Sequence, residues 1–297
     1  MTKNEVIEKI KYYTVPEESL NAIDSRLHSY ITEVFDNPTQ HNKYEILAVF
    51  RFLDFLGRED LEFKNKEVKK FIKFYECLKF PSNNGMQSFK LTPIQVFQFA
   101  NILGFYKKGG EYRLCRDALL FVPRKFSKTT SVASLAIYDL LFGENDAQSY
   151  VGSNSFAQSQ ICFEIIKNSL KELDPKLSHF RLNRDIIYNK MPNKTSLVRC
   201  LAASADKLDG LNASTVILDE FSQADDAALR NVLTSSMGVR KNPLVVTITT
   251  ASSKLDTPFT KMLENYKKVL EGELLNDTIF ASIFQADEDD DIGDVNT

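Results

Sequence analysis

Two short motifs in the middle of the chain have the residue types of a nucleotide-hydrolysing site. The first, PRKFSKTT (123–130), stands between an apolar run and a helical pattern. A phosphate-binding loop needs backbone N–H groups at such a turn, a lysine for the β- and γ-phosphates and a hydroxyl for Mg²⁺. Lys128 and Thr129 have those two groups. Val122 and Ser127 stand where the G-x-x-x-x-G-K-[ST] pattern has glycine, so an ordinary helix start is the alternative interpretation.

The second motif places two adjacent carboxylates at the end of an apolar run. STVIL (214–218) has the pattern of a buried strand, and Asp219 and Glu220 follow it directly. At the carboxyl end of a central strand, the first carboxylate is suited to hold Mg²⁺ and the second to orient or deprotonate the attacking water. An acidic junction without function is the alternative. A later apolar run ends in Thr249 and Thr250, and this order predicts a P-loop ATPase with another strand between the two motif strands.

Arg124 precedes Lys128 by four residues, on the expected rim of the phosphate loop. A guanidinium there would reach γ-phosphate oxygens and stabilise the charge that develops in the transition state. Outside a phosphate site, the same residue would be an exposed charge on a loop.

Apolar runs that alternate with helical patterns predict how these motifs are positioned. From about residue 89 to 286, short runs rich in Val, Ile and Leu alternate with amphipathic segments, which is typical of a mostly parallel sheet flanked by helices. The expected strands are 118–122, 148–152, 214–218, 243–252 and two more between residues 179 and 203. The expected helices are 91–105, 131–143, 156–173, 225–238 and about 257–270. The predicted fold class is therefore α/β, a P-loop NTPase core.

The two ends of the chain differ from this core. Residues 1–88 contain amphipathic patterns at 45–56 and 67–80, which predict an N-terminal helical appendage rather than a dedicated binding surface. Residues 287–297 are rich in Asp and Glu and are expected to be an acidic linker.

Charge is unevenly distributed along the chain. The net charge of the 297 residues is −3, but nine acids and no basic residue lie between positions 269 and 297. Residues 1–268 therefore have 37 bases and 31 acids, a net charge of +6. This positive charge is compatible with a nucleic-acid partner. The first residues have no apolar signal core, and no apolar run approaches the ~20 residues of a membrane helix. We expect a soluble, intracellular protein without a membrane partner.

Several motifs in this order resemble the ATPase domain of the large terminase subunit of tailed bacteriophages. FVPRKFSKTT, VILDEF and TITTAS carry the resemblance, together with LTPIQVFQFANILGF, SYVGSNSFAQSQICF and ADKLDGLNASTVILDE. The resemblance extends from about residue 30 to 285. It implies an ATPase that uses ATP and Mg²⁺ and packages double-stranded viral DNA into a procapsid.

The resemblance also implies roles for individual residues. Lys128 would bind the β- and γ-phosphates, Thr129 and Asp219 would hold Mg²⁺, Glu220 would activate water, and Arg124 would be the arginine of the phosphate loop. Thr249 and Thr250 would be the coupling motif, which senses the γ-phosphate. The nucleotide-binding residues that the resemblance implies are Gln95, Pro123, Arg124, Lys125, Phe126, Ser127, Lys128, Thr129 and Thr130, with Gln95 reading the adenine.

Three positions depart from the pattern of the family. Ile94 stands where an aromatic residue often precedes the glutamine, the segment 221–223 lacks the common histidine, and Ser127 adds a Cβ near the β-phosphate. We therefore expect weak nucleotide binding. The nuclease domain that normally follows is not expected in residues 287–297, so we expect no DNA cleavage by this chain.

The expected partners follow from the resemblance as well. They are double-stranded viral DNA, the portal of the procapsid and the small terminase subunit, met in the host cytoplasm. The chain is expected to form a homo-oligomeric ring on the capsid and to be monomeric alone. Arg230 and Arg240 are candidates for an arginine that completes a neighbour's site, and the loop 204–212 is a candidate DNA-facing element or a simple surface connection.

Two other functions stay open at this point. A helicase-type, DNA-dependent ATPase has the same motifs, although 297 residues leave no room for a second motor domain. A degenerate P-loop domain that acts as an interaction scaffold would explain the missing glycines.

Overall fold

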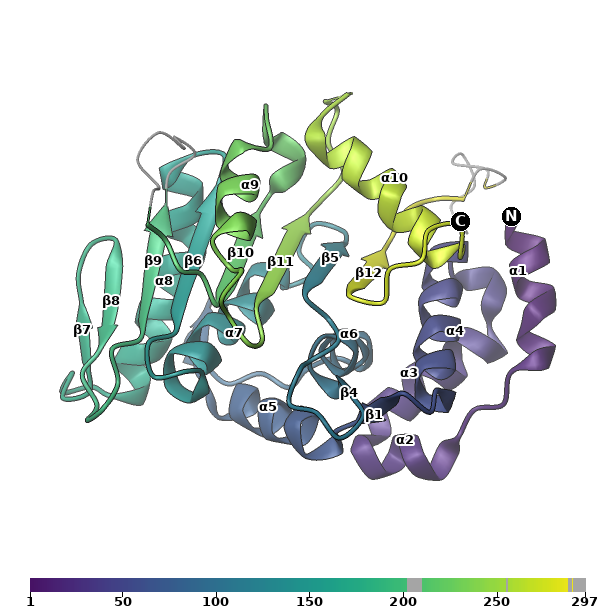
Figure 1. Ribbon diagram of the computed structural model, residues 1–297, viewed down its shortest axis with the longest axis horizontal. Coiled ribbons are helices and arrows are strands. Elements are labelled where there is room, and N and C mark those ends of the chain that lie inside the picture. Colours follow the sequence, from purple (N-terminus) through teal and green to yellow (C-terminus); the bar gives the residue numbers. More distant parts are fainter. Residues whose placement is uncertain (202–209, 255, 288–289, 291–297) are drawn as a thin grey trace.

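An eight-stranded sheet forms the centre of the computed structural model, which describes residues 1–201, 210–254, 256–287 and 290 (Figure 1). In spatial order the strands are β12 (Ile279–Ile283), β5 (Asp117–Phe121), β11 (Leu244–Thr249), β10 (Thr215–Asp219), β6 (Gln148–Ser153), β9 (Leu197–Leu201), β8 (Ile186–Asn189) and β7 (Phe180–Leu182). The strands from β12 to β9 are parallel, and β8 and β7 extend the sheet antiparallel. The prediction of a mostly parallel sheet is confirmed.

The strand between the two motif strands is also present. β11 pairs with β5 on one side and with β10 on the other. Two strands differ from the prediction. The segment between residues 179 and 203 contains three strands instead of two, and β12 at the edge of the sheet had no counterpart among the predicted strands.

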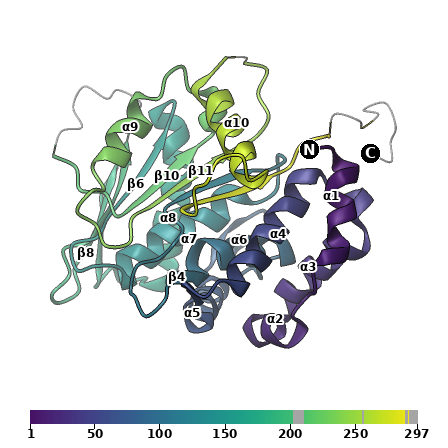
Figure 2. The ribbon, with the colours of Figure 1, turned by 45° about the vertical axis from the view of Figure 1, so that its right-hand side comes forward.

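Helices cover both faces of the sheet (Figure 2). In chain order they are α6 (Pro93–Gly104), α7 (Lys128–Phe142), α8 (Phe156–Leu173), η4 (Phe221–Gln223), α9 (Ala228–Ser235) and α10 (Pro258–Leu270). α7 leads from β5 to β6 and α8 leads from β6 to β7, whereas α9 and α10 lead in the opposite direction along the sheet. Because such crossovers are right-handed, the two pairs of helices lie on opposite faces.

The carboxyl ends of the central strands meet at one edge of the sheet. Asp219 lies opposite Ser153 of β6 and Ile248 of β11, and Thr249 lies opposite Phe121 of β5. In open α/β sheets, ligands bind beyond this edge. The phosphate-loop candidate and the carboxylate pair therefore leave the sheet at the same edge, with one strand, β11, between them.

The N-terminal residues pack directly against this core. Their elements are α1 (Lys3–Lys9), η1 (Ile10–Tyr12), α2 (Glu17–Ile23), α3 (Ser25–Asp36), η2 (Pro38–Gln40), α4 (Lys43–Gly57), β1 (Leu61–Phe63), α5 (Asn65–Cys77), β2 (Phe80–Ser82) and β3 (Gly85–Gln87). β2 pairs with β3, and β1 pairs with β4 (Phe105–Lys107). Phe52 on α4 contacts Phe97 on α6, and Phe97 contacts Phe280 on β12. One hydrophobic core includes residues on both sides of residue 88. The domain boundary expected at that residue stays a prediction.

The first residue of the expected acidic linker belongs to the packed body. Asp287 is buried, accepts a hydrogen bond from the backbone N–H of Lys43 and forms an ion pair of 3.2 Å with Lys3. Residues 288–289 and 291–297 lie outside the described part of the chain. Within the described ranges, no helix has the length and the apolar composition that crossing a membrane requires.

Candidate active site

The phosphate-loop candidate connects β5 to α7 through a backbone that glycine usually provides. Lys125 and Ser127 have φ angles of 63° and 55°, in the left-handed region. This conformation costs a residue with a Cβ about 1 kcal/mol or more. Ser127 stands where the usual pattern has its second glycine, so the loop adopts a left-handed turn at that position without the glycine.

The backbone N–H groups of this loop have no hydrogen-bond partner in the described part of the chain. Arg124, Lys125, Phe126 and Ser127 donate no backbone hydrogen bond to any residue that the structure describes. The first N–H groups of α7, which begins at Lys128, likewise have no intrahelical partner. Free N–H groups at a helix start bind anions, and phosphate in particular.

Lys128 and Glu220 connect the two motifs. The Lys128 Nζ lies 2.9 Å from Glu220 Oε1, and only 11% and 21% of the two side chains are exposed. Glu220 Oε2 accepts hydrogen bonds from the backbone N–H and the hydroxyl of Thr250, at 3.3 and 3.2 Å. The Glu220 carboxylate is therefore held from two sides. Its backbone is left-handed as well, with φ of 52°.

Asp219 and Thr129 form the second contact between the motifs. The Thr129 hydroxyl donates to Asp219 Oδ2 at 3.3 Å. Burial, and after it the neighbouring charge of Glu220, raise the pKa of Asp219 to about 6. Asp219 Oδ1 is buried and has no hydrogen-bond partner among the described residues. A buried carboxylate oxygen without a partner needs a compensating cation or donor.

Thr129 and Asp219 have ligand atoms that are suited to Mg²⁺. The hydroxyl of Thr129 and the unpaired oxygen of Asp219 are hard oxygen donors, which this ion prefers. The described residues contain no group of three or more His, Cys, Asp or Glu side chains that would hold a metal by themselves. Mg²⁺ in nucleotide sites takes one or two protein oxygens and completes its shell with phosphate and water, so this donor set is adequate.

Thr249 ties the end of β11 to the turn that follows Glu220. Its hydroxyl oxygen accepts a hydrogen bond of 3.0 Å from the backbone N–H of Ser222. Thr249 and Thr250 thus both contact the segment of the carboxylate pair. The predicted coupling residues lie between the two predicted motif strands and touch the second motif.

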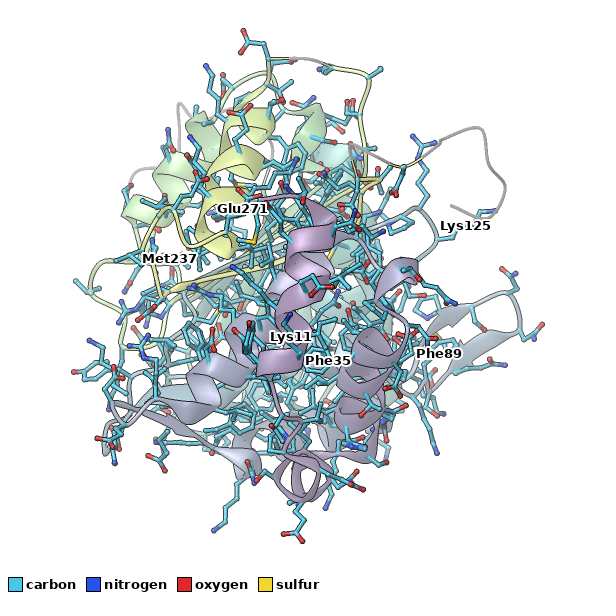
Figure 3. All side chains as sticks on the ribbon, turned by 90° about the vertical axis from the view of Figure 1, so that its right-hand side faces the viewer. Lys11, Phe35, Phe89, Lys125, Met237 and Glu271 are labelled. Atoms are coloured by element: carbon cyan, nitrogen blue, oxygen red, sulfur yellow. The ribbon has the colours of Figure 1, made fainter. Side chains whose placement is uncertain are left out.

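Gln95 lies at a pocket of about 440 Å³ beside the phosphate loop. Its lining includes Phe89, Gln95, Lys125, Ser127 and Thr130. Figure 3 shows Phe89 and Lys125 on the same side of the molecule. The Gln95 Oε1 accepts from the backbone N–H of Thr92 in the N-terminal cap of α6, and contact of Gln95 with an adenine stays a prediction.

The remaining predicted site residues lie apart from this cluster. Arg124 is exposed and has no hydrogen bond or ion pair with another described residue. Pro123 lines a different pocket, together with His41 and Asn42. The Phe126 ring packs against the ring of Phe284, with centroids 5.6 Å apart.

Arg230 and Arg240, the candidates for an arginine that reaches a neighbouring chain, both form ion pairs within their own chain, and that role stays a prediction. Arg230 forms an ion pair with Asp117 of the same chain and also donates to the hydroxyl of Tyr266. Arg240 is 6% exposed and pairs with Glu144 and Asp146, at 2.8 and 2.9 Å. Arg240 is held by these contacts, whereas the buried Nε of Arg230 has no hydrogen-bond partner among the described residues. The proposed loop 204–212 lies outside the described residues up to position 209.

Sequence reasoning missed Ser153, at the carboxyl end of β6. It lies opposite Asp219 in the register, and its hydroxyl is buried without a hydrogen-bond partner among the described residues. The sequence does show a polar residue at the end of the run QSYVGS, which could have indicated a site residue. It does not show that β6 and β10 are neighbours, because 61 residues separate the two strands in the chain.

Comparison with known proteins places the chain in a family. The family described as "Terminase large subunit, ATPase domain" matches residues 93–268. Protein YmfN of Escherichia coli (strain K12) is 31% identical over 83 residues, which are 28% of this chain and 18% of that protein.

The fold is similar to that of a solved terminase structure. The large terminase of bacteriophage HK97 matches with a TM-score of 0.61 and 21% identity, over 76% of this chain and 46% of that one. The large terminase of a thermophilic bacteriophage in complex with ADP matches with a TM-score of 0.44 and 15% identity, over 57% of this chain and 40% of that one. The chain thus spans less than half of these terminases. The family match covers more than half of the chain, which therefore belongs to the family of terminase large-subunit ATPase domains.

Proposed function

We propose that this chain hydrolyses ATP with Mg²⁺ and that hydrolysis drives double-stranded viral DNA into a procapsid. The observation that carries the proposal is the convergence of Lys128, Thr129, Asp219 and Glu220 at one edge of the sheet, with Thr250 on the catalytic carboxylate. Membership in the family of terminase ATPase domains supports the same function.

The ion pair between Lys128 and Glu220 indicates how binding of ATP would prepare the site. The β- and γ-phosphates would compete with Glu220 for the ammonium of Lys128, while the free N–H groups of the loop hold the phosphate oxygens. The released Glu220 oxygen would then accept a proton from the water that attacks the γ-phosphorus. Mg²⁺, when held by Thr129 and Asp219, would neutralise charge on the phosphates.

Loss of the γ-phosphate would reverse this exchange. Lys128 would return to Glu220, and Thr250 would stay on the other carboxylate oxygen. Because Thr250 directly follows β11 and Thr249 ends it, a movement of Glu220 would be transmitted to a central strand. We propose this as the coupling step. Arg124, exposed on the loop, would stabilise charge on the γ-phosphate once a nucleotide is present.

The partners of the whole protein belong to the same proposal. We propose that the portal of the procapsid and the small terminase subunit bind the assembled protein in the host cytoplasm, and that several copies form a ring there. The acidic stretch 287–297 is proposed as the junction to the next part of a terminase, and cleavage of DNA is not assigned to these residues.

Substitution of Glu220 by Gln tests the proposal. ATP hydrolysis is measured with and without duplex DNA, and nucleotide binding is measured in parallel with a fluorescent ATP analogue. We expect Glu220→Gln to lower turnover by a factor of about 10² to 10⁴, the usual contribution of a general base, and to leave binding intact. Glu264→Gln, at an exposed position on α10, is the matched control. Normal turnover by Glu220→Gln would refute the assignment.

The scaffold function is the second candidate, and the left-handed Lys125 and Ser127 favour it. Strain at positions without glycine would be tolerated in a loop that no longer binds phosphate. Absence of both nucleotide binding and turnover in the wild-type chain, even with portal and DNA, would favour the scaffold.

A further inference from the structure

The strands β7, β8 and β9 lie at the edge of the sheet farthest from the N-terminal helices (Figure 1), and this part of the chain is rich in basic residues. Between residues 174 and 201 there are six bases and two acids, a net charge of +4 in a chain whose net charge is −3. We call these bases the basic edge: Lys176, Arg181, Arg184, Lys190, Lys194 and Arg199. All of them except Lys194 are exposed.

The sheet places two of the arginines on one open face. Arg181 of β7 lies opposite Tyr188 of β8, and Arg199 of β9 lies opposite Ile186 of β8. Residues that alternate with them, such as Phe180, Ile187 and Val198, are buried on the face that α8 covers. Since side chains alternate between faces, Arg181, Tyr188 and Arg199 point away from α8. Neighbouring strands are ~4.8 Å apart, so the arginines of β7 and β9 span about 10 Å across the sheet.

The charges of the basic edge are not neutralised within the described chain. None of its six bases forms an ion pair with a described residue, whereas Arg58 and Arg240 elsewhere each pair with two acids. Arg181 lies over the ring of Tyr188 at 5.8 Å, and Arg184 lies over the ring of Phe156 at 5.9 Å. Stacking on an aromatic ring orients a guanidinium and leaves its N–H groups available.

The surroundings of these charges favour a polyanion over a protein partner. Protein interfaces depend on a few buried aromatic or apolar anchors. Among the described residues 174–201, Tyr188 is the one large hydrophobic side chain that is exposed, at 36%, and it already stacks on Arg181. Exposed arginines that form no ion pair with a described residue fit closely spaced phosphates, because a DNA duplex has one negative charge per ~1.7 Å of its axis.

We propose that the basic edge binds the phosphate backbone of duplex DNA without reading its sequence. This inference rests on the proposed function and assigns the DNA contact to the face of β7, β8 and β9. β9 pairs with β6, and β6 pairs with β10, the strand of Asp219. The proposed DNA contact and the proposed hydrolytic site thus lie on the same sheet, and β6 is the strand that separates β9 from β10.

The test removes three charges and measures DNA binding directly. The variant Arg181→Gln/Arg184→Gln/Arg199→Gln in the full chain is compared with the wild type for binding of a short fluorescent duplex, by anisotropy at several salt concentrations. We expect at least tenfold weaker binding near 0.1 M salt, and a slope of log K against log salt that is shallower by about two to three, since each phosphate contact contributes about 0.9. Basal ATP hydrolysis without DNA should be unchanged.

The control variant is Lys66→Gln/Lys69→Gln/Lys73→Gln on α5, which removes the same charge from other exposed positions. Thermal melting verifies that both variants fold, and the single variant Arg184→Gln, in the turn between β7 and β8, serves if the triple variant does not. Equal losses in both triple variants, unchanged binding by the variant of the basic edge, or no binding by the wild type would overturn the inference. Normal DNA binding without ATP hydrolysis would instead contradict the proposed function and leave the DNA surface in place.

Discussion

The phosphate loop and the carboxylate turn are two strand-to-helix connections at the same edge of the sheet, and they are held in opposite ways. The turn after β10 is fixed by β11, because Glu220 donates its backbone N–H to Ile248 and its carboxylate accepts from Thr250. The loop after β5 has left-handed residues too, but the N–H groups of residues 124–127 bind no described residue. The Glu220 carboxylate is therefore held in place by the fold, whereas the N–H groups of residues 124–127 stay available for a ligand.

This difference indicates that ATP would bind the N–H groups of residues 124–127, which have no partner among the described residues. Preorganised dipoles and charges stabilise a transition state without reorganisation, so the carboxylate side is the part that the fold builds in advance. Strain at a functional site persists where the surroundings or a ligand compensate for it. The phosphate side is therefore the part that we expect to respond to the nucleotide.

Removal of Lys128 should give the largest effect, because this side chain connects the two regions. Lys128→Ala should lower turnover at least a hundredfold and weaken nucleotide binding, and it leaves the largely buried Glu220 without its cation. Steady-state hydrolysis and a binding titration measure both effects. Lys261→Ala, at an exposed position on α10, should change neither. Normal turnover in Lys128→Ala would place the phosphate site elsewhere.

Thr250→Val should loosen the preorganised turn while the phosphate loop stays unchanged. It removes the hydroxyl that donates to Glu220 Oε2 at 3.2 Å. A hydrogen bond to a charged group contributes about 1.5 to 3 kcal/mol, so turnover should fall roughly ten- to hundredfold, with little change in nucleotide affinity. Thr250→Ser keeps the hydroxyl and should stay near the wild type. If both variants behaved alike, the hydroxyl would not hold the carboxylate.

The buried charge of Asp219 predicts a pH-dependent stability of the metal-free protein. Its pKa of about 6 in the folded state lies above the ordinary value of 3.8, so the folded state binds the proton more tightly than the unfolded state. The free energy of unfolding of the wild type therefore falls as the pH rises from about 4 to about 6. Asp219→Asn should remove this loss, and thermal melting in a chelator should show a gain on the order of 1 to 3 kcal/mol at pH 8 and almost none near pH 4. Asp225→Asn, at an exposed acid, is the control. A gain that is independent of pH would contradict the assignment.

Ser127→Gly should relax the phosphate loop and give the smallest effect. Glycine adopts a φ of 55° without strain, which would stabilise the fold by up to about 1 kcal/mol and strengthen nucleotide binding severalfold. Melting temperature and a binding titration measure the change. Ser127→Ala keeps the Cβ and should show no gain. An equal gain from alanine would mean that the hydroxyl, and not the backbone, limits the loop.

The sequence predicted the parallel sheet and the position of Asp219 and Glu220 at its edge, because short segments of the sequence indicate both features. Apolar runs gave the strands, and the position of Asp219 and Glu220 directly after a run placed them at the carboxyl edge. The strand between the motif strands followed from the order of the motifs. The ion pair of Lys128 with Glu220 brings together residues 92 positions apart, and only tertiary packing selects such a contact.

The features that the sequence did not show have physical reasons as well. A sequence does not show that Arg230 pairs with Asp117, or that Arg240 pairs with Glu144 and Asp146. β7 and β8 merged in the prediction because the turn between them, 183–185, has neither Gly nor Pro. The free N–H groups of the phosphate loop were likewise invisible in the sequence, since a substituted glycine gives no information about the backbone conformation.

The packing of Phe126 against Phe284 has a spectroscopic consequence. The chain contains no tryptophan, and the ring of Phe126 lies in the phosphate loop, partly exposed and next to a second aromatic ring. An indole introduced by Phe126→Trp would be the sole tryptophan emitter of the protein. Its emission wavelength and its accessibility to a quencher would report directly on the loop, so that arrival and departure of a nucleotide become visible in a stopped-flow trace without a labelled ligand.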